Sequence, residues 1–475
     1  MNYQIKNICC IGAGYVGGPS MAVIADNCTN TIVNVVDLNQ ERIDLWNSKD
    51  LSNLPIYEPG LKEIIKRRRG KNLFFSTEIK KHISEADMIF ISVNTPTKLK
   101  GIGAGEAIDL KWVEASSRKI SQYAKGKTIV VEKSTLPVRT AETIKNILNS
   151  NTKKPNVDSN NQEFYILSNP EFLAEGTAIN DLENPDRILI GGDNNNAIQA
   201  LESIYSNWIN KDKIIKTDLW SAELSKLIAN AFLAQRISSI NSISALCEVT
   251  GANIKEVANA IGKDKRIGEL FLNSGPGFGG SCFKKDILNL VYICKYYGLH
   301  ETANYWQQVL EINKWQQERI SNLIINKLFG TVVGKRLSIL GFSFKKNTND
   351  TRESPAIKIC KDLIEEGAKL NIYDPKVKSK VIEKDLNLKE SIDFDNNSEL
   401  GEWRFASNIE ESAVDADALI FLTEWEEFRS INWQNISNKM RDPKWIFDTR
   451  SIDLSKEAQK FGFNIWMIGE GKNYS

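Results

Sequence analysis

The stretch NICCIGAGYVGGPS, residues 7–20, decides the fold of the first part of the chain. An apolar run leads into a turn where Gly12, Gly14 and Gly17 stand in the spacing G-x-G-x-x-G, and a helical apolar pattern follows. A second apolar run ends in Asp37, about 20 residues further on. This order predicts a dinucleotide-binding Rossmann unit. Because a carboxylate accepts hydrogen bonds from a ribose and repels a 2′-phosphate, Asp37 predicts NAD rather than NADP.

Further apolar runs recur at the spacing of strand–helix–strand units, over residues 86–96, 127–137, 163–172 and 188–192. They predict a doubly wound α/β domain over residues 1–217. The polar, turn-rich stretch 151–162 is expected to form a surface loop in this domain.

The pattern changes from residue 218, where about 30 residues without glycine or proline keep a helical apolar period. They predict one long helix. Its apolar positions go nearly all the way round and include Leu224, Leu227, Phe232, Ile240 and Leu246. A helix that is apolar on most faces must be buried between domains or subunits. Short helices are expected after it, so residues 218–330 predict a central helical domain that also forms a dimer contact.

The last part of the chain repeats the order of the first, because residues 334–344, 356–367 and 368–375 read as strand, helix and strand ending in an acid. The glycine fingerprint is missing, since Gly341 stands alone. Residues 331–475 therefore predict a second Rossmann-like domain that binds something other than a dinucleotide, such as a nucleotide-linked substrate. The predicted fold class is α/β: two Rossmann-like doubly wound domains joined by a long central helix and a helical middle domain.

The composition excludes several functional classes. A net charge of +1 gives no field that would attract nucleic acid or a membrane surface. The N-terminus has no signal-peptide pattern, and no apolar run is long enough to span a bilayer, so we expect a soluble, cytoplasmic protein. The seven cysteines are odd in number and contain no C-x-x-C pair, which argues against disulfides and against a metal site.

Histidine is nearly absent, and His82 and His300 are both expected at the surface. Acid–base chemistry would then fall to carboxylates, lysine or a thiolate. Five of the seven cysteines are predicted to be core residues: Cys9, Cys10, Cys247, Cys294 and Cys360.

The stretch GPGFGGSC, residues 275–282, places Cys282 after a glycine-rich loop and before a helical pattern. A thiol at a helix N-terminus with lysines nearby is stabilised as thiolate, so Cys282 is a candidate nucleophile. A buried core cysteine is the alternative. An NAD enzyme with a cysteine nucleophile can oxidise an aldehyde, because the thiohemiacetal releases a second hydride and leaves a thioester for water to open.

Two further segments carry candidate groups. In NPEFLAEGTAI, residues 169–179, Asn169 is expected to cap a short helix that places Glu171 and Glu175 on one face. An exposed acidic first turn is the alternative. Lys226 and Asn230 stand four apart on the long helix, where a buried lysine needs either a chemical role or a salt-bridge partner.

Taken together, the motifs resemble those of the UDP-glucose/GDP-mannose dehydrogenase family, most closely its UDP-glucose enzymes of eukaryotic type. The segments that carry the resemblance are GAGYVGGPS, NTPT, EKSTLPVRTAE, NPEFLAEGTAI, ELSKLIANAFLAQRISSIN, RIG, GFGGSCFKKD, GFSFKKNTNDTRES and FDTR. The resemblance implies oxidation of UDP-glucose to UDP-glucuronate with two NAD, through a thioester on Cys282. It also implies that Lys226 and Asn230 stabilise oxyanions, while Glu171, Asp286 and Thr135 handle protons and water.

The resemblance further assigns binding residues. Those for NAD are Gly12, Gly14, Tyr15, Val16, Gly17, Asp37, Arg42, Thr95, Ser134, Thr135, Glu175, Lys285 and Arg352. Those for the substrate are Glu171, Phe172, Leu173, Lys226, Asn230, Arg266, Phe271, Gly279, Phe283, Phe344, Lys345 and Arg450. Arg266 is expected to reach the site of a neighbouring subunit in a dimer or a trimer of dimers, and no metal is expected.

Other interpretations stay open at this stage. The same chemistry could act on a UDP-N-acetylhexosamine or on GDP-mannose. A two-electron hydroxyacid-type dehydrogenase would share the buried lysine without needing Cys282, and a non-catalytic NAD-binding scaffold would need none of these side chains. The chain departs from the family pattern at Leu136, where valine is usual, and in the Asn- and Lys-rich segment between residue 376 and FDTR no motif of the family is assigned.

Overall fold

The structure is a computed structural model that describes residues 4–150, 162–394, 398–452 and 455–471. The surface loop predicted over 151–162 lies outside the described residues except for Gln162. The chain divides into two compact units. Unit 1 comprises Met1–Ala229 and Leu288–Tyr297, and unit 2 comprises Asn230–Ile287 and Gly298–Ser475.

Unit 1 contains an eight-stranded sheet in the order β3-β2-β1-β4-β5-β6-β7-β8, parallel except between β6 and β7. The first six strands have the order of a dinucleotide-binding Rossmann domain, as predicted. The strands are β1 (Asn7–Ile11), β2 (Ile32–Val36), β3 (Leu73–Ser76), β4 (Met88–Ile91), β5 (Lys127–Glu132), β6 (Glu163–Ser168), β7 (Ile188–Gly192) and β8 (Ile214–Thr217). The helices are α1 (Gly17–Asn27), α2 (Gln40–Asn47), α3 (Leu61–Arg68), α4 (Ile79–Glu85), α5 (Lys111–Tyr123), α6 (Thr140–Ser150), α7 (Ala178–Glu183) and α8 (Asn195–Tyr205).

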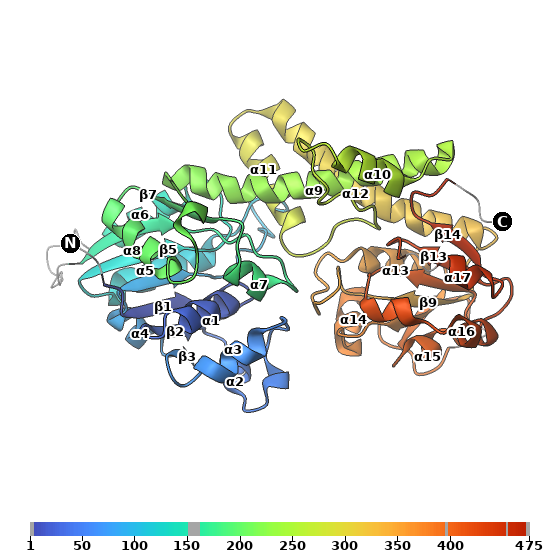
Figure 1. The fold of residues 1–475 in the computed structure, drawn as a ribbon, viewed down its shortest axis with the longest axis horizontal. Helices are drawn as coiled ribbons and strands as arrows, with labels where there is room; N and C mark the ends of the chain where they lie inside the picture. Colours follow the sequence, from blue (N-terminus) through green and yellow to red (C-terminus); the bar gives the residue numbers. More distant parts are fainter. Residues whose placement is uncertain (1–3, 151–161, 395–397, 453–454, 472–475) are drawn as a thin grey trace. The chain divides into compact units, whose positions relative to one another are not determined.

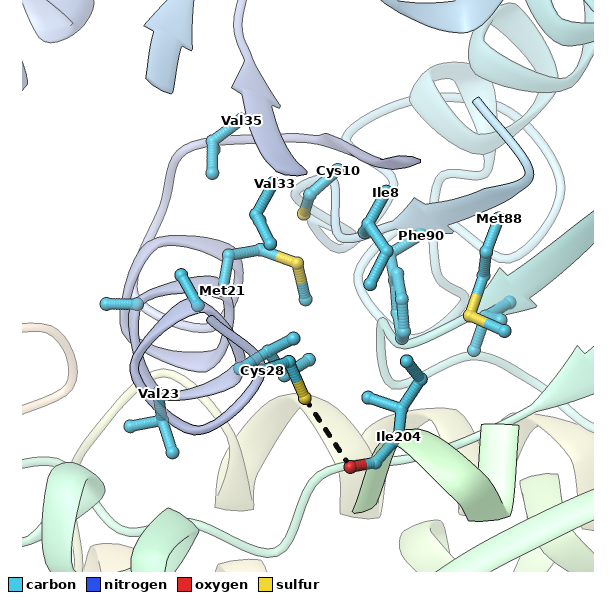
Figure 2. Close-up of a cluster of buried hydrophobic side chains, with 14 of the residues drawn as sticks. Ile8, Cys10, Met21, Val23, Cys28, Val33, Val35, Met88, Phe90 and Ile204 are labelled. Atoms are coloured by element: carbon cyan, nitrogen blue, oxygen red, sulfur yellow. Dashed lines mark hydrogen bonds between the residues drawn. The ribbon is translucent and has the colours of Figure 1, made fainter. Parts of the chain in front are cut away.

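Helices cover both faces of this sheet (Figure 1). Successive residues of a strand point to opposite faces, so the adjacent Cys9 and Cys10 enter different cores. The core around Cys10 takes residues from α1, α3 and α8, and the core around Cys9 takes residues from α4, α5 and α6. Figure 2 shows Cys10 and Cys28 among apolar side chains, with the Cys28 thiol donating to the carbonyl of Ile204 at 3.6 Å.

Unit 2 contains a six-stranded, fully parallel sheet in the order β11-β10-β9-β12-β13-β14. This is again the Rossmann order, so the predicted second α/β domain is confirmed as a fold. Its strands are β9 (Arg336–Leu340), β10 (Lys369–Tyr373), β11 (Glu402–Phe405), β12 (Ala418–Phe421), β13 (Trp445–Asp448) and β14 (Asn464–Met467). The helices that follow β9 along the chain are α13 (Pro355–Glu365), α14 (Ser379–Leu386), α15 (Ile409–Ser412), α16 (Trp433–Lys439) and α17 (Ser455–Gln459).

Four helices form the middle of the chain (Figure 1). They are α9 (Leu219–Thr250), α10 (Ile254–Gly262), α11 (Phe283–Tyr296) and α12 (His300–Lys327). The predicted long helix is confirmed, because α9 runs for 32 residues. The expectation of short helices after it was wrong for α12, whose 28 residues contain no glycine or proline to end it.

In the single chain the apolar residues of α9 are only partly buried: Leu227 and Ile240 are covered, whereas Phe232 and Leu246 are 53% and 54% exposed. Burial of the exposed residues against another subunit stays a prediction. One other prediction about burial was wrong. His82 was expected at the surface but is buried, because it lies on the same face of α4 as the buried Ile79 and Ile83. Among the described residues, no helix is both long and apolar enough to cross a membrane.

The turn after β1 allows a direct test of the fold. Gly12 has φ +112°, and a Cβ there would lie 2.2 Å from the carbonyl oxygen of Ser92, whereas a Cβ at Gly14 would meet nothing within 4 Å. We expect Gly12→Ala to lower the free energy of unfolding by about 2–4 kcal/mol, from backbone strain and overpacking. Gly14→Ala should change it by less than about 1 kcal/mol. Urea unfolding of both variants checks this, and equal losses would contradict the described turn.

Candidate active site

The glycine turn of unit 1 has the geometry that a dinucleotide requires. A Cβ at Gly17 would lie 2.1 Å from the carbonyl oxygen of Gly12, so only glycine lets α1 pack this closely against the turn. Gly14 faces open space at the start of α1, where backbone N–H groups point outward. Tyr15 and Val16, half-buried, complete the turn, and Val16 occupies the N-cap position of α1. The residues present therefore fit a pyrophosphate.

The acid at the end of β2 fixes this turn while keeping acceptor capacity. The carboxylate of Asp37 accepts from Ala13 N at 3.0 Å and from Asn39 N at 2.9 Å, and it pairs with Arg42 at 3.2 Å. Its side chain is 14% exposed. A carboxylate has about four acceptor positions, so Asp37 can still accept from a ribose hydroxyl.

The equivalent acid of unit 2, Asp374, behaves differently. Its side chain is buried, and it receives hydrogen bonds from the backbone N–H groups of Phe342, Ser343, Lys376 and Val377, the hydroxyl of Ser343 and the indole of Trp425. Protein donors thus saturate the carboxylate. The second Rossmann unit therefore cannot offer this acid to a ribose, which agrees with its lack of a glycine fingerprint.

The ends of β4 and β5 meet at the carboxyl edge of the sheet of unit 1. Ser134 donates its hydroxyl to Val93 O at 2.8 Å, and Thr95 donates its hydroxyl to Thr135 O at 3.3 Å. All three hydroxyl residues, Thr95, Ser134 and Thr135, are buried. The structure therefore brings these predicted cofactor residues together, at the edge where ligands bind in open α/β sheets.

The segment after β6 does not form the predicted helix. Residues 169–174 belong to no helix or strand, and α7 begins only at Ala178. Asn169 cannot cap a helix because its side chain is already engaged: it donates to Leu189 O at 2.8 Å and accepts from Lys133 and from the hydroxyl of Tyr205. Glu171 and Glu175 therefore do not share a helix face, and Glu175 lies half-buried in the turn before α7.

Glu171 instead forms a buried ion pair with the lysine of α9. The Nζ atom of Lys226 lies 3.3 Å from Oε1 of Glu171, and the two side chains are 5% and 6% exposed. Oε2 of Glu171 accepts from Leu173 N at 2.9 Å, a local hydrogen bond within the segment. Two cations lie near the ring of Phe172, with the guanidinium of Arg187 at 3.9 Å and Nζ of Lys226 at 5.4 Å from its centroid. The salt bridge that the sequence left open is therefore present.

A second pair of acids, Glu132 and Glu223, is buried beside this segment. Glu223 of α9 accepts from Arg139 N at 2.6 Å and from Ala141 N at 2.7 Å, which satisfies the first turn of α6. Burial and the neighbouring Glu223 raise the pKa of Glu132 well above its ordinary range. Burial also raises the pKa of Glu223, while the backbone donors lower it. Burial and the neighbouring Glu223 therefore both favour the neutral form of Glu132.

In unit 2, Cys282 immediately precedes α11, and its carbonyl accepts from Asp286 N at 2.9 Å, the first hydrogen bond of that helix. The predicted position at a helix N-terminus is confirmed. Of the seven cysteines, all within the described residues, six are buried and only Cys282 is partly exposed. Burial raises the pKa of Cys10 to about 12 and the pKa of Cys28 to about 11. It also raises the pKa of Cys9, Cys247, Cys294 and Cys360.

The acid on the first turn of α11 is fully buried. Asp286 accepts from Nδ2 of Asn230 at 2.6 Å, and Nζ of Lys285 lies 4.0 Å from its other oxygen. Asn230 lies one helical turn after Lys226 on α9. Two predicted catalytic residues of one helix thus each have an acidic partner.

The glycines before Cys282 let its loop pack against the loop after β9. A Cβ at Gly279 would lie 2.6 Å from the carbonyl oxygen of Glu353 and 2.8 Å from Cβ of Phe344. Gly280 N donates to Arg352 O at 2.8 Å. Phe283 opens α11 with its ring edge-on to Phe278 at 5.7 Å. Gly279, Phe344 and Arg352 are therefore neighbours in unit 2.

The remaining predicted substrate residues lie in loops of unit 2. Arg450 donates to Leu422 O at 2.8 Å and to Phe344 O at 3.1 Å, so it holds two loops together. Lys345 is half-buried, with its Nζ atom 5.5 Å from the ring centroid of Phe344. Arg266 is 90% exposed and pairs with Asp264, and Phe271 has φ +61° in the same exposed stretch.

Sequence reasoning missed several buried polar residues around these groups. Lys133, Tyr205 and Glu132 support the ends of β5 and β6, and Glu223 supports α6. The available signals were a lysine just after the apolar centre of a strand, residues 129–131, and an acid three residues before Lys226. Neither signal indicates a partner, because the partners come from distant parts of the sequence.

Comparisons with known proteins agree along the whole chain. Residues 6–209, 220–315 and 338–453 match the NAD binding, central and UDP binding domains of the UDP-glucose/GDP-mannose dehydrogenase family. The chain is 53% identical over 475 residues to UDP-glucose 6-dehydrogenase 3 of Oryza sativa subsp. japonica, covering 98% of this chain and 97% of that protein. It is 54% identical over 474 residues to UDP-glucose 6-dehydrogenase of Gallus gallus, covering 98% and 94%. A UDP-glucose dehydrogenase structure from Pyrobaculum islandicum aligns with a TM-score of 0.82 and 26% identity, over 99% of this chain and 98% of that one.

The raised pKa of Glu132 leads to a prediction about how stability depends on pH. A carboxyl group whose pKa is raised on folding stabilises the fold at low pH and loses that contribution as the pH rises above its ordinary pKa, near 4.5. A glutamine at this position keeps a hydrogen-bond donor, its amide N–H, but does not titrate. We therefore expect Glu132→Gln to be more stable than the parent, with a gap in urea midpoint that widens from pH 5 to pH 8. The exposed Glu301→Gln is the control, and a gap that shrinks with rising pH would contradict the assignment.

Proposed function

The chain belongs to the UDP-glucose/GDP-mannose dehydrogenase family, and on this premise we propose that it oxidises UDP-glucose to UDP-glucuronate with two NAD, as a UDP-glucose 6-dehydrogenase. The observation that carries the proposal is the place of Cys282, the one partly exposed thiol among seven, at the start of a helix in the family's central domain. A two-electron alcohol dehydrogenase would have no use for this thiol.

NAD is the cofactor, and its binding domain covers residues 6–209. When bound, it supplies the hydride acceptor for both oxidation steps. Within this chain Gly12, Gly14 and Gly17 would cradle the pyrophosphate, and Asp37 would hold the ribose. The buried edge formed by Thr95 and the segment 134–135 would face the cofactor.

In the proposed reaction, the carbon-6 alcohol first loses a hydride and a proton to give the aldehyde. The Cys282 sulfur then adds to the aldehyde carbon, and the resulting thiohemiacetal loses the second hydride to become a thioester. Water attacks the thioester carbonyl, the carbon–sulfur bond breaks, and the carboxylate and the thiol are released. When the sulfur adds to the aldehyde and when water adds to the thioester, negative charge develops on the carbonyl oxygen of carbon 6.

That charge needs donors held in place beforehand. The ammonium of Lys226 pairs with Glu171, and the amide of Asn230 donates to Asp286. We assign stabilisation of the oxyanion to this ammonium and this amide, whose acidic partners hold them in place. We assign proton transfer and the placement of water to Glu171 and Asp286, with Thr135.

The UDP moiety would bind unit 2, whose residues 338–453 match the UDP binding domain. Lys345 and Arg450 supply positive charge there for the diphosphate. We propose three functional parts, residues 1–217 for NAD, 218–330 for the centre and 331–475 for the UDP-sugar. The thiol must stay reduced, which favours the cytoplasm.

We also propose that the protein is a homo-oligomer built on a dimer. In unit 2, helix α9 leaves Phe232, Ile243 and Leu246 between 39% and 54% exposed. An apolar helix face of this kind fits a second copy of the chain. Arg266, 90% exposed, is placed to reach a neighbouring subunit.

Replacement of the nucleophile tests the proposed function. We expect Cys282→Ser to bind NAD as the parent does but to form UDP-glucuronate at least about 10³-fold more slowly, because a serine hydroxyl is a far weaker nucleophile at neutral pH. Chromatography of the product and calorimetry of NAD binding measure the two effects. Cys247→Ala, which removes a buried thiol, should keep the parent rate within about twofold.

Parent-like turnover by Cys282→Ser would rule the mechanism out. A parent enzyme that oxidises GDP-mannose or UDP-N-acetylglucosamine faster than UDP-glucose would contradict the assigned substrate.

A further inference from the structure

The loop that carries Cys282 is held by buried amide side chains that the chemistry above does not use. Asn313 of α12 accepts from Phe278 N at 2.8 Å and donates to Phe278 O at 3.1 Å. One side chain thus pairs both backbone groups of a loop residue, as a neighbouring strand would. The side chain of Asn313 is buried, which places this pairing away from water.

Two further amides hold the start of the same loop. Asn241 of α9 accepts from Gly275 N at 2.8 Å, and Gln316 of α12 donates to Gly275 O at 2.9 Å. Both residues have no exposed surface. Arg319 donates to the other end of the Gln316 amide at 3.1 Å and so fixes its orientation. We call Asn241, Asn313 and Gln316 the amide clamp.

The clamp explains a glycine in the loop. Gly277 has φ +123°, and a Cβ there would lie 2.8 Å from Oδ1 of Asn313. Any larger residue would push the loop away from the amide that binds Phe278. The second glycine of GPGF is therefore required by the clamp as well as by backbone conformation.

The position of the clamped loop affects the position of the Cys282 thiol, because both are fixed by packing within unit 2. Phe278 contacts Phe283, the first residue of α11, with the two rings edge-on at 5.7 Å. Gly280 N is bound by Arg352 O at 2.8 Å. Cys282 lies between these fixed points, so a displacement of the loop at Phe278 also displaces Cys282.

We propose that Asn313, together with Asn241 and Gln316, is a positioning residue for the Cys282 thiol, and that the clamp sets the place from which the sulfur reaches the aldehyde carbon. The role in turnover rests on the proposed function above. A buried hydrogen bond adds little net stability over an apolar side chain of the same shape. Because three amide side chains bind one four-residue stretch, we infer that they fix the geometry of the loop rather than add stability.

The test replaces Asn313 by aspartate in the full-length enzyme. Asn313→Asp keeps the shape but removes the donor to Phe278 O and sets a carboxylate against it. Loss of one buried hydrogen bond raises the open population of the loop about tenfold, so iodoacetamide should alkylate Cys282 about tenfold faster. The kcat for UDP-glucose should fall about 10- to 100-fold through misplacement of the sulfur, while the KM for NAD stays within about twofold. Mass spectrometry locates the alkylated cysteine.

Asn371→Asp is the matched control. Asn371 of β10 is also fully buried and bonded at both ends, to Ser412 O at 3.0 Å and to Arg404 at 2.7 Å, but it does not touch the loop. It should leave the alkylation rate and kcat within about twofold of the parent. A second variant, Gly277→Ala, perturbs the clamp from the loop side and should reproduce the effects of Asn313→Asp.

An unchanged alkylation rate in Asn313→Asp, or in Gly277→Ala if Asn313→Asp does not fold, would overturn the proposal. An equal increase in Asn371→Asp would overturn it as well, because the effect would then follow any buried amide. If the parent fails to oxidise UDP-glucose, the proposed function fails, while the alkylation rates still decide whether the clamp positions the thiol.

Discussion

The buried ion pair between Lys226 and Glu171 is the interaction on which much of unit 1 depends. Leaving either charge without its partner in the interior costs about 3–5 kcal/mol, so the lysine of α9 and the segment after β6 must be placed together. The ring of Phe172 then lies near the cations of both Lys226 and Arg187. The ion pair also keeps the Lys226 ammonium buried on α9, one helical turn before Asn230.

The two Rossmann units share one fold but match domains that bind different ligands, NAD and UDP. Both begin with a strand, a glycine of positive φ and a second strand ending in an acid. In unit 1 the acid, Asp37, keeps acceptor capacity beside an open turn, whereas in unit 2 protein donors saturate Asp374. The two units therefore differ in how this carboxylate is satisfied and in the glycine fingerprint that unit 2 lacks, while their Rossmann strand order is the same.

Sequence patterns predicted what depends on local chemistry. Apolar runs located most strands, the lack of glycine and proline predicted α9, and the glycine loop placed Cys282 at a helix N-terminus. The patterns failed where distant residues compete for a side chain. Asn169 looks like a helix cap, but Lys133 and Tyr205 engage it, and Asn313 looks like any polar helix residue although it binds Phe278. Such partners become apparent only once the strands and helices are placed.

The central claim is that this chain uses a thiol to carry one alcohol through two successive oxidations. The most direct test is the number of NADH formed per UDP-glucose consumed to completion, followed by absorbance with limiting sugar and excess NAD. A thioester route gives two NADH for each UDP-glucose, because the aldehyde stays on the enzyme until water releases the acid. One NADH per UDP-glucose, with the aldehyde as the product, would contradict it.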